Sequence, residues 1–426
     1  MTGLLFITFL ILLLIGVPIA FAIAVSGSVV LLSGGVNPLI VVQRMFAATD
    51  SFSLVAVPFF ILAGDLLARG SMSRTLVAFA ESILGRIRGG LSAVAVAAGM
   101  FFAAISGSGA ATTAAVGATL IPELKKRDYD EASSAALVAA SGCIGVVIPP
   151  SVPMVLYAVI AEQSVTQLFS NGFFPGLLMG GILIAIALHQ AHVRNYPKGA
   201  EFSLRNVWAT FRKAIWAILM PAIILGGIFS GQFTPSEASA VAVIYAAVIS
   251  FLIYRDMTLK ELANIILGSA KTSAVIMIII ACSGVFGWVL ANWKIPEQMA
   301  QAVLSVSSNK YVILFLIAVI VLIAGIFMET SSAVILLTPV FLPLVKALGV
   351  DLVHFGLIFT IGISIGMITP PVAINLFVAS STTGLPIEKI SKSVIPYLLG
   401  LIAVFLLYVY LPLFLPGLIF GGGMAA

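Results

Sequence analysis

Long apolar stretches, almost free of charge, recur along the whole chain. Eight of them approach or exceed the length of a helix that crosses a bilayer, which takes about 20 residues; they are 4–32, 132–161, 172–188, 215–229, 238–254, 274–291, 312–328 and 394–414. Of the 426 residues, 61% are hydrophobic and only 9% are charged, against about 25% charged residues in soluble domains. No globular core hides that much apolar surface. Lipid must therefore be the solvent, and we predict an all-α polytopic membrane protein.

The opening stretch, 4–32, is predicted to be the first membrane helix. Its apolar run is longer than that of a signal peptide, it lacks a basic start, and no small-residue cleavage pattern follows it. We therefore expect this stretch to stay in the membrane.

Lys and Arg gather in short connections between the apolar stretches. The clusters lie at 69–88, 125–127 and 194–213, and the net charge of +5 comes from them. Basic residues beside membrane helices are typical of the cytoplasmic side. We interpret them as topology signals that contact the head groups of the lipid bilayer, with no role in nucleic-acid binding.

The two halves of the chain share a pattern of prolines, glycines and rare charges. Pro122 recurs as Pro343, and the two prolines at 149–150 recur at 370–371, in each case 221 residues later (343 − 122 = 370 − 149 = 221). The same spacing aligns Lys125 with Lys346, Asp130 with Asp351 and Gly145 with Gly366. Internal repeats are typical of secondary transporters, whose sites lie where the repeats meet. An odd number of crossings per unit would make the repeats inverted, and an even number would make them parallel.

We predict two repeat units on either side of a polar linker. The first unit covers 1–192, the linker covers 193–214, and the second unit covers 215–426. The linker is the only long polar stretch in the chain, as a boundary between two membrane units should be.

Small and polar residues interrupt the apolar sequence at 106–109, which reads Ser-Gly-Ser-Gly. Glycine costs about 1 kcal/mol relative to alanine in a helix interior, so a helix break is predicted here. In lipid, a break is tolerated only where protein or a water-filled cavity surrounds the backbone. Freed carbonyls and hydroxyls suit a small cation such as Na⁺, whereas free N–H groups at a half-helix N-terminus suit a carboxylate. Close helix packing through small residues is an equally open interpretation.

The double prolines predict a second kind of break. Proline removes a backbone donor and pushes the preceding residue out of the helical conformation, so no helix runs straight through 149–150 or 370–371. A simple kink needs only one proline, and recurrence of the pair favours a site in each half. The carbonyls of Gly145, Ile148 and Pro150 are the candidate cation ligands in the first half.

One carboxylate falls deep inside apolar sequence. Glu329 lies within 312–344 and aligns with the Ser-Gly-Ser-Gly break. Because an ionisable residue at membrane depth is costly, it is a functional candidate by default. We expect Glu329 to cap a half-helix, with cation binding and proton transfer as alternatives, and Asn375 to contact substrate or backbone. Asp65 lies nearer the end of an apolar run, where we expect a solvated or paired side chain.

The chain carries no recognisable catalytic motif. A Walker A motif, a nucleophile elbow and a zinc-protease helix are all absent from the sequence, which disfavours an ATP-driven pump and an enzyme. Broken helices paired across a repeat favour alternating access over a channel.

Four segments resemble those of the large membrane subunit of TRAP (tripartite ATP-independent periplasmic) transporters. They are SGSGAATTAAVGATLIPEL, GVVIPPSVPMVLYA, METSSAVILLTPVFLPL and GMITPPVAINLFVA, in that order, and the resemblance covers essentially the whole chain. It implies two inverted repeat units with broken helices and two re-entrant hairpins, whose tips lie at 106–109 and 329–332. The implied architecture is that of an elevator-type ion transporter, in which a transport domain moves against a scaffold.

The resemblance also implies where ions and substrate bind. A first sodium site would use Ser106, Ser108, Gly145, Ile148 and Pro150; a second would use Gly325, Glu329, Thr330, Gly366, Thr369 and Pro371. Substrate would lie between the tips, near Thr112, Ser151, Ser331 and Asn375.

The family resemblance further implies the reaction and the partners. Such proteins import an organic acid, for example sialic acid or a C4-dicarboxylate, across the bacterial inner membrane by symport with two or more Na⁺ and without an organic cofactor. The implied partners are a small four-helix membrane subunit, expected here as a separate chain, and a periplasmic substrate-binding protein. The alternative is a stand-alone Na⁺/anion symporter of the same superfamily, without a binding protein.

Overall fold

The computed structural model describes residues 1–426 except 69–70, 199–200, 296, 299–300, 302–308 and 415–426. Arg69 of the first basic cluster and part of the predicted linker therefore lie outside the described residues. Within the described part of the chain, all named elements are helices, and one isolated β-bridge joins Arg88 to Lys198. The predicted all-α membrane protein is confirmed.

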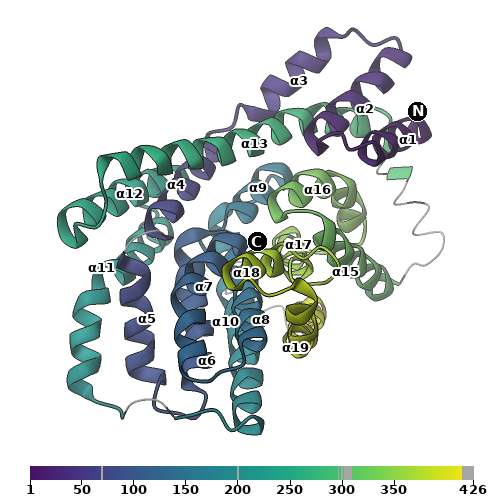
Figure 1. Ribbon diagram of the computed structural model, residues 1–426. Coiled ribbons are helices and arrows are strands. Elements are labelled where there is room, and N and C mark those ends of the chain that lie inside the picture. The colour runs from purple at the N-terminus through teal and green to yellow at the C-terminus, as the bar shows by residue number, and fades with distance from the viewer. Residues whose placement is uncertain (69–70, 199–200, 296, 299–300, 302–308, 415–426) are drawn as a thin grey trace.

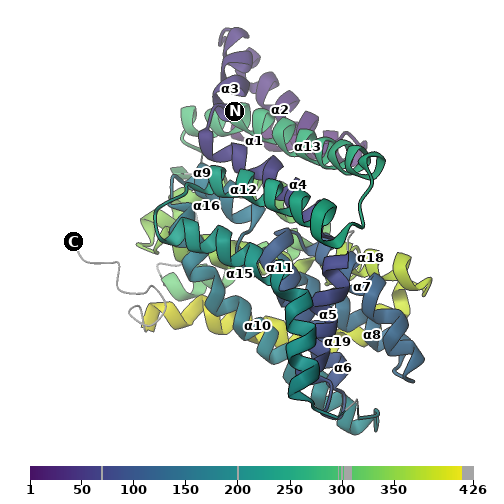
Figure 2. The ribbon, with the colours of Figure 1, turned by 90° about the vertical axis from the view of Figure 1, so that its left-hand side faces the viewer.

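The first group of helices forms an angular frame around one side of the molecule (Figures 1 and 2). Its members are α1 (Thr2–Leu14), α2 (Ile19–Ser33), α3 (Leu39–Thr49), η1 (Phe52–Val55), α4 (Ala56–Ala68), α5 (Ser71–Leu84), α11 (Leu204–Phe229), α12 (Pro235–Val248), η3 (Ile249–Tyr254) and α13 (Leu259–Asn292). The long helix α13 packs against α2, α3 and α4, while α11 packs against α5 and α12 against α4.

The second group forms the core, which the frame flanks on one side. Its members are α6 (Gly90–Ser106), α7 (Gly109–Lys126), α8 (Glu131–Gly142), η2 (Cys143–Val146), α9 (Val152–Ala161), α10 (Val165–Val193), α15 (Lys310–Phe327), α16 (Thr330–Ala347), α17 (Leu352–Gly366), α18 (Ile374–Thr383) and α19 (Ile387–Phe414). Helices α7 and α8 pack against α18, and α9 packs against α16. Segments from the two halves of the chain thus share one core.

Element bounds repeat at the spacing seen in the sequence. Subtracting 221 from the bounds of α16 (330 and 347) gives 109 and 126, which are the bounds of α7. In each half the double proline is followed by a helix of 10 residues, α9 or α18, and then by a long helix, α10 or α19. The polar stretch 193–214 includes the beginning of α11, since that helix starts at Leu204.

The expectation of one membrane helix over 4–32 is wrong. The stretch forms two helices, α1 and α2, which pack against each other. Pro18 is the N-cap of α2, and Gly16 in the turn has a positive φ. Proline at a helix start needs no backbone partner, so Gly16 and Pro18 together convert one long apolar run into a helical hairpin.

Seven described helices are long and apolar enough to cross a membrane, or eight if the bent pair formed by 39–49 and 52–68 counts as one span. That pair bends by 65°. Several further apolar helices, including α6 and α17, are shorter than a full crossing. Such short helices are tolerated at membrane depth when protein surrounds their ends.

Candidate functional site

The break predicted at 106–109 is present and forms the tip of the hairpin made by α6 and α7. Helix α6 ends at Ser106, and Gly107 follows with φ +59°, in the left-handed region that glycine adopts without strain. Ser108 then caps α7, its hydroxyl accepting a hydrogen bond from the Ala111 N–H at 3.4 Å. The chain therefore reverses direction at this tip within two residues.

This first tip lies against the first double proline. A Cβ atom added at Gly107 would lie 2.8 Å from the carbonyl oxygen of Pro150 and 3.3 Å from the Val152 nitrogen. Pro150 and Ile148 are buried beneath the tip. Only a glycine allows the two broken segments to approach this closely, so the tip and the proline loop form one unit.

Oxygen atoms gather where these two broken segments meet. The Ser106 hydroxyl lies 2.9 Å from the Thr112 hydroxyl and donates to the Ser108 carbonyl at 3.3 Å. A Cβ atom at Gly145 would lie 2.6 Å from Thr112 Oγ1 and 2.7 Å from the Ser108 carbonyl oxygen. The structure thus brings Ser106, Ser108 and Gly145 of the first predicted ion site together, with Thr112 beside them. Hydroxyl and carbonyl oxygens are the ligands that hard cations prefer.

Glu329 forms the second hairpin tip, between α15 and α16. Its Oε2 accepts hydrogen bonds from the N–H groups of Ser331 at 2.8 Å and Ser332 at 3.2 Å, and its Oε1 accepts one from the Ser331 hydroxyl at 3.2 Å. The predicted cap of a half-helix is confirmed. An anion at a helix N-terminus is stabilised by the helix dipole.

The residues predicted for the second ion site do not form one cluster of oxygen ligands. Some lie at the second hairpin tip, and others are in contacts between packed helices. A Cβ atom at Gly325 would lie 3.0 Å from the Gly366 Cα, so the backbones of α15 and α17 touch there. The Thr330 hydroxyl donates to Met367 Sδ at 3.0 Å, and the Thr369 hydroxyl donates to the Ile365 carbonyl at 2.9 Å. Pro371 is exposed, in contrast to Pro150.

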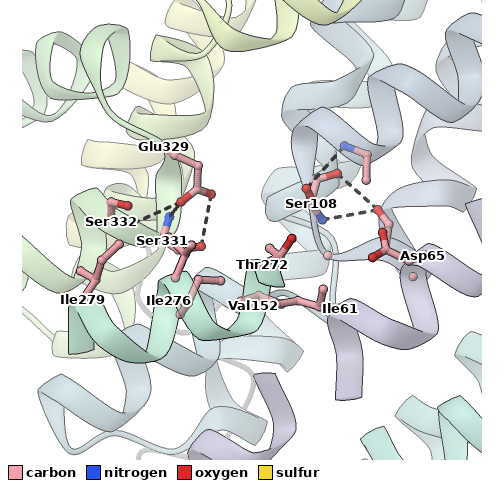
Figure 3. Close-up of a pocket in the computed structure, with 15 residues that line it drawn as sticks. Ile61, Asp65, Ser108, Val152, Thr272, Ile276, Ile279, Glu329, Ser331 and Ser332 are labelled. Carbon is pink, nitrogen blue, oxygen red and sulfur yellow. Dashed lines mark hydrogen bonds between the residues drawn. The ribbon is translucent and has the colours of Figure 1, made fainter. Parts of the chain in front are cut away.

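A cavity of about 450 Å³ lies between the two tips and the frame. Its lining comprises Ile61, Gly64, Asp65, Ser106, Gly107, Ser108, Ala111, Val152, Thr272, Val275, Ile276, Ile279, Glu329, Ser331 and Ser332. Figure 3 shows Glu329, Ser331 and Ser332 facing Ser108 and Asp65 across the cavity, with Ile276 and Ile279 of α13 along another side. The volume suits a small organic molecule.

Among the predicted substrate residues, Ser331 lines this cavity. The other three lie elsewhere in the described core. Thr112 belongs to the oxygen cluster behind the tip, and Ser151 caps α9 while donating to the Val146 carbonyl at 2.6 Å. Asn375 is fully buried, its Nδ2 donating to the Ala139 carbonyl at 3.3 Å.

The frame side of the cavity was not anticipated. Asp65 of α4 accepts a hydrogen bond from the Ser269 hydroxyl of α13 at 2.6 Å, and Thr272 and Ile276 continue the lining along α13. In the sequence, what marks Asp65 as a candidate for a functional site is that it is a carboxylate in the third turn of an apolar helix. Nothing in the sequence connects it to Ser269, 204 residues away.

The charges around the cavity are all negative in the described lining. Asp65 and Glu329 contribute carboxylates, and no Lys, Arg or His is among the lining residues. Ionised carboxylates at these two positions would repel an anionic ligand. Seryl and threonyl hydroxyls supply the remaining polar contacts, and isoleucines and valines supply an apolar wall.

Sequence comparison gives a family match over nearly the whole chain. Residues 6–414 match the family model described as "Tripartite ATP-independent periplasmic transporter, DctM component". The match includes both hairpins and both double prolines.

Named relatives agree with this match. The chain is 41% identical over 369 residues to the C4-dicarboxylate TRAP transporter large permease protein DctM of Pseudomonas aeruginosa, covering 87% of this chain and 86% of that protein. It is 41% identical over 409 residues to the isethionate TRAP transporter permease protein DctMQ of Oleidesulfovibrio alaskensis, covering 95% of this chain and 64% of that protein. It is 34% identical over 418 residues to the sialic acid TRAP transporter large permease protein SiaM of Vibrio cholerae, covering 97% of each.

Solved structures show the same fold at low sequence identity. The YdaH transporter of Alcanivorax borkumensis superposes with a TM-score of 0.66 at 15% identity, covering 88% of both chains. MtrF of Neisseria gonorrhoeae superposes with a TM-score of 0.59 at 15% identity, covering 87% of this chain and 83% of that one. At this identity the likeness concerns the fold alone.

Proposed function

Because the chain belongs to the family of DctM components of tripartite ATP-independent periplasmic transporters, we propose that it imports a carboxylate by Na⁺ symport. The protein is a multi-pass integral protein of the inner membrane. The observation that carries the proposal is the 450 Å³ cavity into which both broken hairpin tips and two frame helices project. Broken helices that meet at the junction of two repeats are where secondary transporters bind their substrates.

The substrate class rests on relatives and on the chemistry of the lining. Relatives bear names for C4-dicarboxylate, sialic acid and 2,3-diketo-L-gulonate transport, whose substrates are carboxylates, and one bears a name for transport of isethionate, a sulfonate. In this chain Ser108, Ser331 and Ser332 supply hydroxyls near the tips, and Ile276 and Ile279 supply an apolar wall. Such a lining suits a small hydroxylated acid with its carboxylate directed to the tips.

The charge of the cavity lining supports the proposed coupling to Na⁺. A carboxylate that enters beside Asp65 and Glu329 meets two like charges, which disfavour binding unless cations accompany it. The first sodium site is proposed at Ser106, Ser108, Gly145, Ile148 and Pro150. The Ser106 hydroxyl and the Ser108 carbonyl lie close to each other there, beside Gly145. The second is proposed at Gly325, Glu329, Thr330, Gly366, Thr369 and Pro371. Each Na⁺ moving inward down the membrane potential contributes about 2.3 kcal/mol per 100 mV.

The cavity lies at the boundary between core and frame, which suggests how access alternates. Its core side comes from α6, α7, α9 and α16 with the two tips, and its frame side comes from α4 and α13. The apolar side chains Ile61, Ile276 and Ile279 on the frame side present a surface without fixed hydrogen-bond geometry. We propose an elevator motion in which the core carries substrate and ions past this surface.

The proposed partners are a small membrane subunit and a periplasmic substrate-binding protein. The DctMQ relative is longer than this chain, which covers 64% of it. The family description itself names a tripartite assembly. In this proposal the binding protein delivers the substrate and the small subunit braces the frame helices.

Uptake into proteoliposomes tests the proposal. The purified chain with its small subunit is given an inward Na⁺ gradient and radiolabelled succinate or sialic acid, with and without the cognate binding protein. Uptake that requires both Na⁺ and the binding protein supports the proposal. Uptake that persists when K⁺ or choline replaces Na⁺ refutes the coupling, and uptake without the binding protein identifies a stand-alone symporter.

A further inference from the structure

Two connections between frame and core run side by side at one end of the molecule. One joins α5 to α6 and the other joins α10 to α11, and both lie at the lower end in Figure 1. Arg88 in the first pairs with Lys198 in the second as an antiparallel β-bridge, and the Gly89 N–H donates to the Pro197 carbonyl at 3.4 Å. The two connections are therefore held together by their backbones.

A basic cavity opens where these connections meet. Its volume is about 720 Å³, and its lining comprises Arg86, Ile87, Arg88, Leu188, His192, Lys198 and Glu201. Four of these seven side chains are Arg, Lys or His, and one is acidic. The cavity is separate from the one between the hairpin tips, with which it shares no lining residue.

The cations of this cavity lack the partners that neighbouring cations have. Arg127 forms an ion pair with Glu81 at 2.7 Å, and Arg194 forms one with Asp130 at 3.1 Å. In the described part of the chain no ion pair involves Arg86, Arg88 or Lys198.

Arg88 carries the clearest sign of a missing ligand. Its Nη1 donates to Asn195 Oδ1 at 3.2 Å, but its Nε is buried without an acceptor among the described residues. A buried N–H without a partner is disfavoured and rare in native structures. A guanidinium binds phosphate oxygens in a bidentate manner, and an anion in the cavity would supply the missing acceptor once the Arg88 side chain turns its Nε edge toward it.

We propose that this cavity, which we call the connection pocket, binds the phosphate of an anionic lipid headgroup. Ile87 and Leu188 stand among the basic residues of the lining, and Ile87 is 44% exposed. A free phosphate makes no use of apolar neighbours, whereas a lipid joins its headgroup to acyl chains. Basic residues at helix ends are typical of the cytoplasmic side, and basic pockets there bind anionic lipid headgroups.

The position of the pocket gives the bound lipid a mechanical consequence. Arg88 and Lys198 belong to the two segments that connect the core helices α6 and α10 to the frame helices α5 and α11. One phosphate bound by both segments ties them together more firmly than the β-bridge alone. Anionic lipid therefore stabilises this junction against thermal unfolding.

Native mass spectrometry and thermal unfolding of the full chain in detergent test the proposal. Phosphatidylglycerol, phosphatidylcholine and inorganic phosphate are titrated against the wild type and against Arg86→Gln, Arg88→Gln and Lys198→Gln. Lys126→Gln is the matched control, because it removes one positive charge from a side chain that is 76% exposed outside the pocket. Arg86 and Lys198 are exposed, so their variants keep the test valid if Arg88→Gln fails to fold.

We expect phosphatidylglycerol to bind more tightly than phosphatidylcholine and each pocket variant to weaken it about fivefold, the effect of one basic residue near a membrane surface. Lys126→Gln is expected to leave the affinity unchanged. Equal binding of the two lipids by the wild type, or equal weakening by Lys126→Gln and the pocket variants, overturns the proposal. Stabilisation by inorganic phosphate that matches that by phosphatidylglycerol assigns the pocket to a soluble anion and overturns the lipid.

Discussion

The hydroxyl of Ser106 lies 2.9 Å from the hydroxyl of Thr112, across the break between α6 and α7. The contact exists because α6 stops at Ser106 and the Ser108 cap restarts the chain as α7, whose first turn contains Thr112. Thr112 was expected near the substrate, yet its side chain adds a further oxygen to the group formed by Ser106 and Ser108. We therefore include Thr112 among the candidate ligands of the first sodium site.

Replacing Gly145 with alanine is expected to damage this sodium site selectively. The added Cβ would lie 2.6 Å from Thr112 Oγ1 and 2.7 Å from the Ser108 carbonyl oxygen, so the oxygens must separate. We expect the Na⁺ concentration for half-maximal uptake to rise at least tenfold, about 1.4 kcal/mol or more. Gly181→Ala is the control, since no atom lies within 4 Å of its added Cβ. Unchanged Na⁺ dependence in Gly145→Ala contradicts the first site.

Glu329 is predicted to stabilise α16 through its carboxylate oxygens. Glu329→Ala removes the acceptor for the Ser331 and Ser332 N–H groups, and loss of an N-cap costs about 1 kcal/mol of unfolding free energy. Glu329→Gln keeps one acceptor oxygen and should lose less. Thermal unfolding of both variants measures the difference; equal destabilisation would show that the charge, and not the cap, provides the stability. A separate loss of Na⁺ coupling in the glutamine variant would support the second sodium site.

Helix breaks that are caused by the residues at the break itself can be predicted from the sequence. Ser106 to Ser108 and the double prolines disrupt helices through their own backbone chemistry, and Glu329 caps the residues that directly follow it. The repeat then indicated that these breaks correspond, because α7 and α16 have the same bounds 221 residues apart. Gly16 and Pro18 also indicate a break within 1–33. The prediction of one helix there gave more weight to the length of the apolar run than to these two residues.

Contacts between distant segments were not predictable in the same way. Asp65 looked like one of several carboxylates near the ends of apolar runs, and its neighbour Ser269 lies on a helix without any break. Ser151 and Asn375 are polar residues beside the double prolines, but they point into the core of the described structure. Which face a helix presents to a cavity depends on its packing partners, and one sequence does not contain that information.

The hydrogen bond between Asp65 and Ser269 is predicted to couple α4 to α13 beside the cavity. The bond is 2.6 Å long and partly buried, and a hydrogen bond to a charged group contributes about 1.5–3 kcal/mol. Asp65→Asn and Ser269→Ala should therefore be non-additive in a double-mutant cycle on unfolding free energy. Asp65→Asn should also tighten binding of an anionic substrate, because one of two repelling carboxylates is removed. Additive effects of the two substitutions would show that the bond does not contribute.

A comparison of two glycines tests how tightly the connections between core and frame are packed. Gly89 and Gly35 both have positive φ, +73° and +70°, so alanine at either site costs about 1–2 kcal/mol in backbone strain. Only at Gly89 does the added Cβ meet another atom, the Ala191 Cβ of α10 at 2.1 Å, whereas at Gly35 nothing lies within 4 Å. Ala191 cannot rotate away, so α10 must shift, and such overpacking adds about 1–3 kcal/mol. We expect Gly89→Ala to lower the unfolding temperature clearly more than Gly35→Ala. If the two substitutions lower the unfolding temperature equally, the backbone at Gly89 moves away from Ala191 without cost. That result would contradict a rigid junction between α6 and α10.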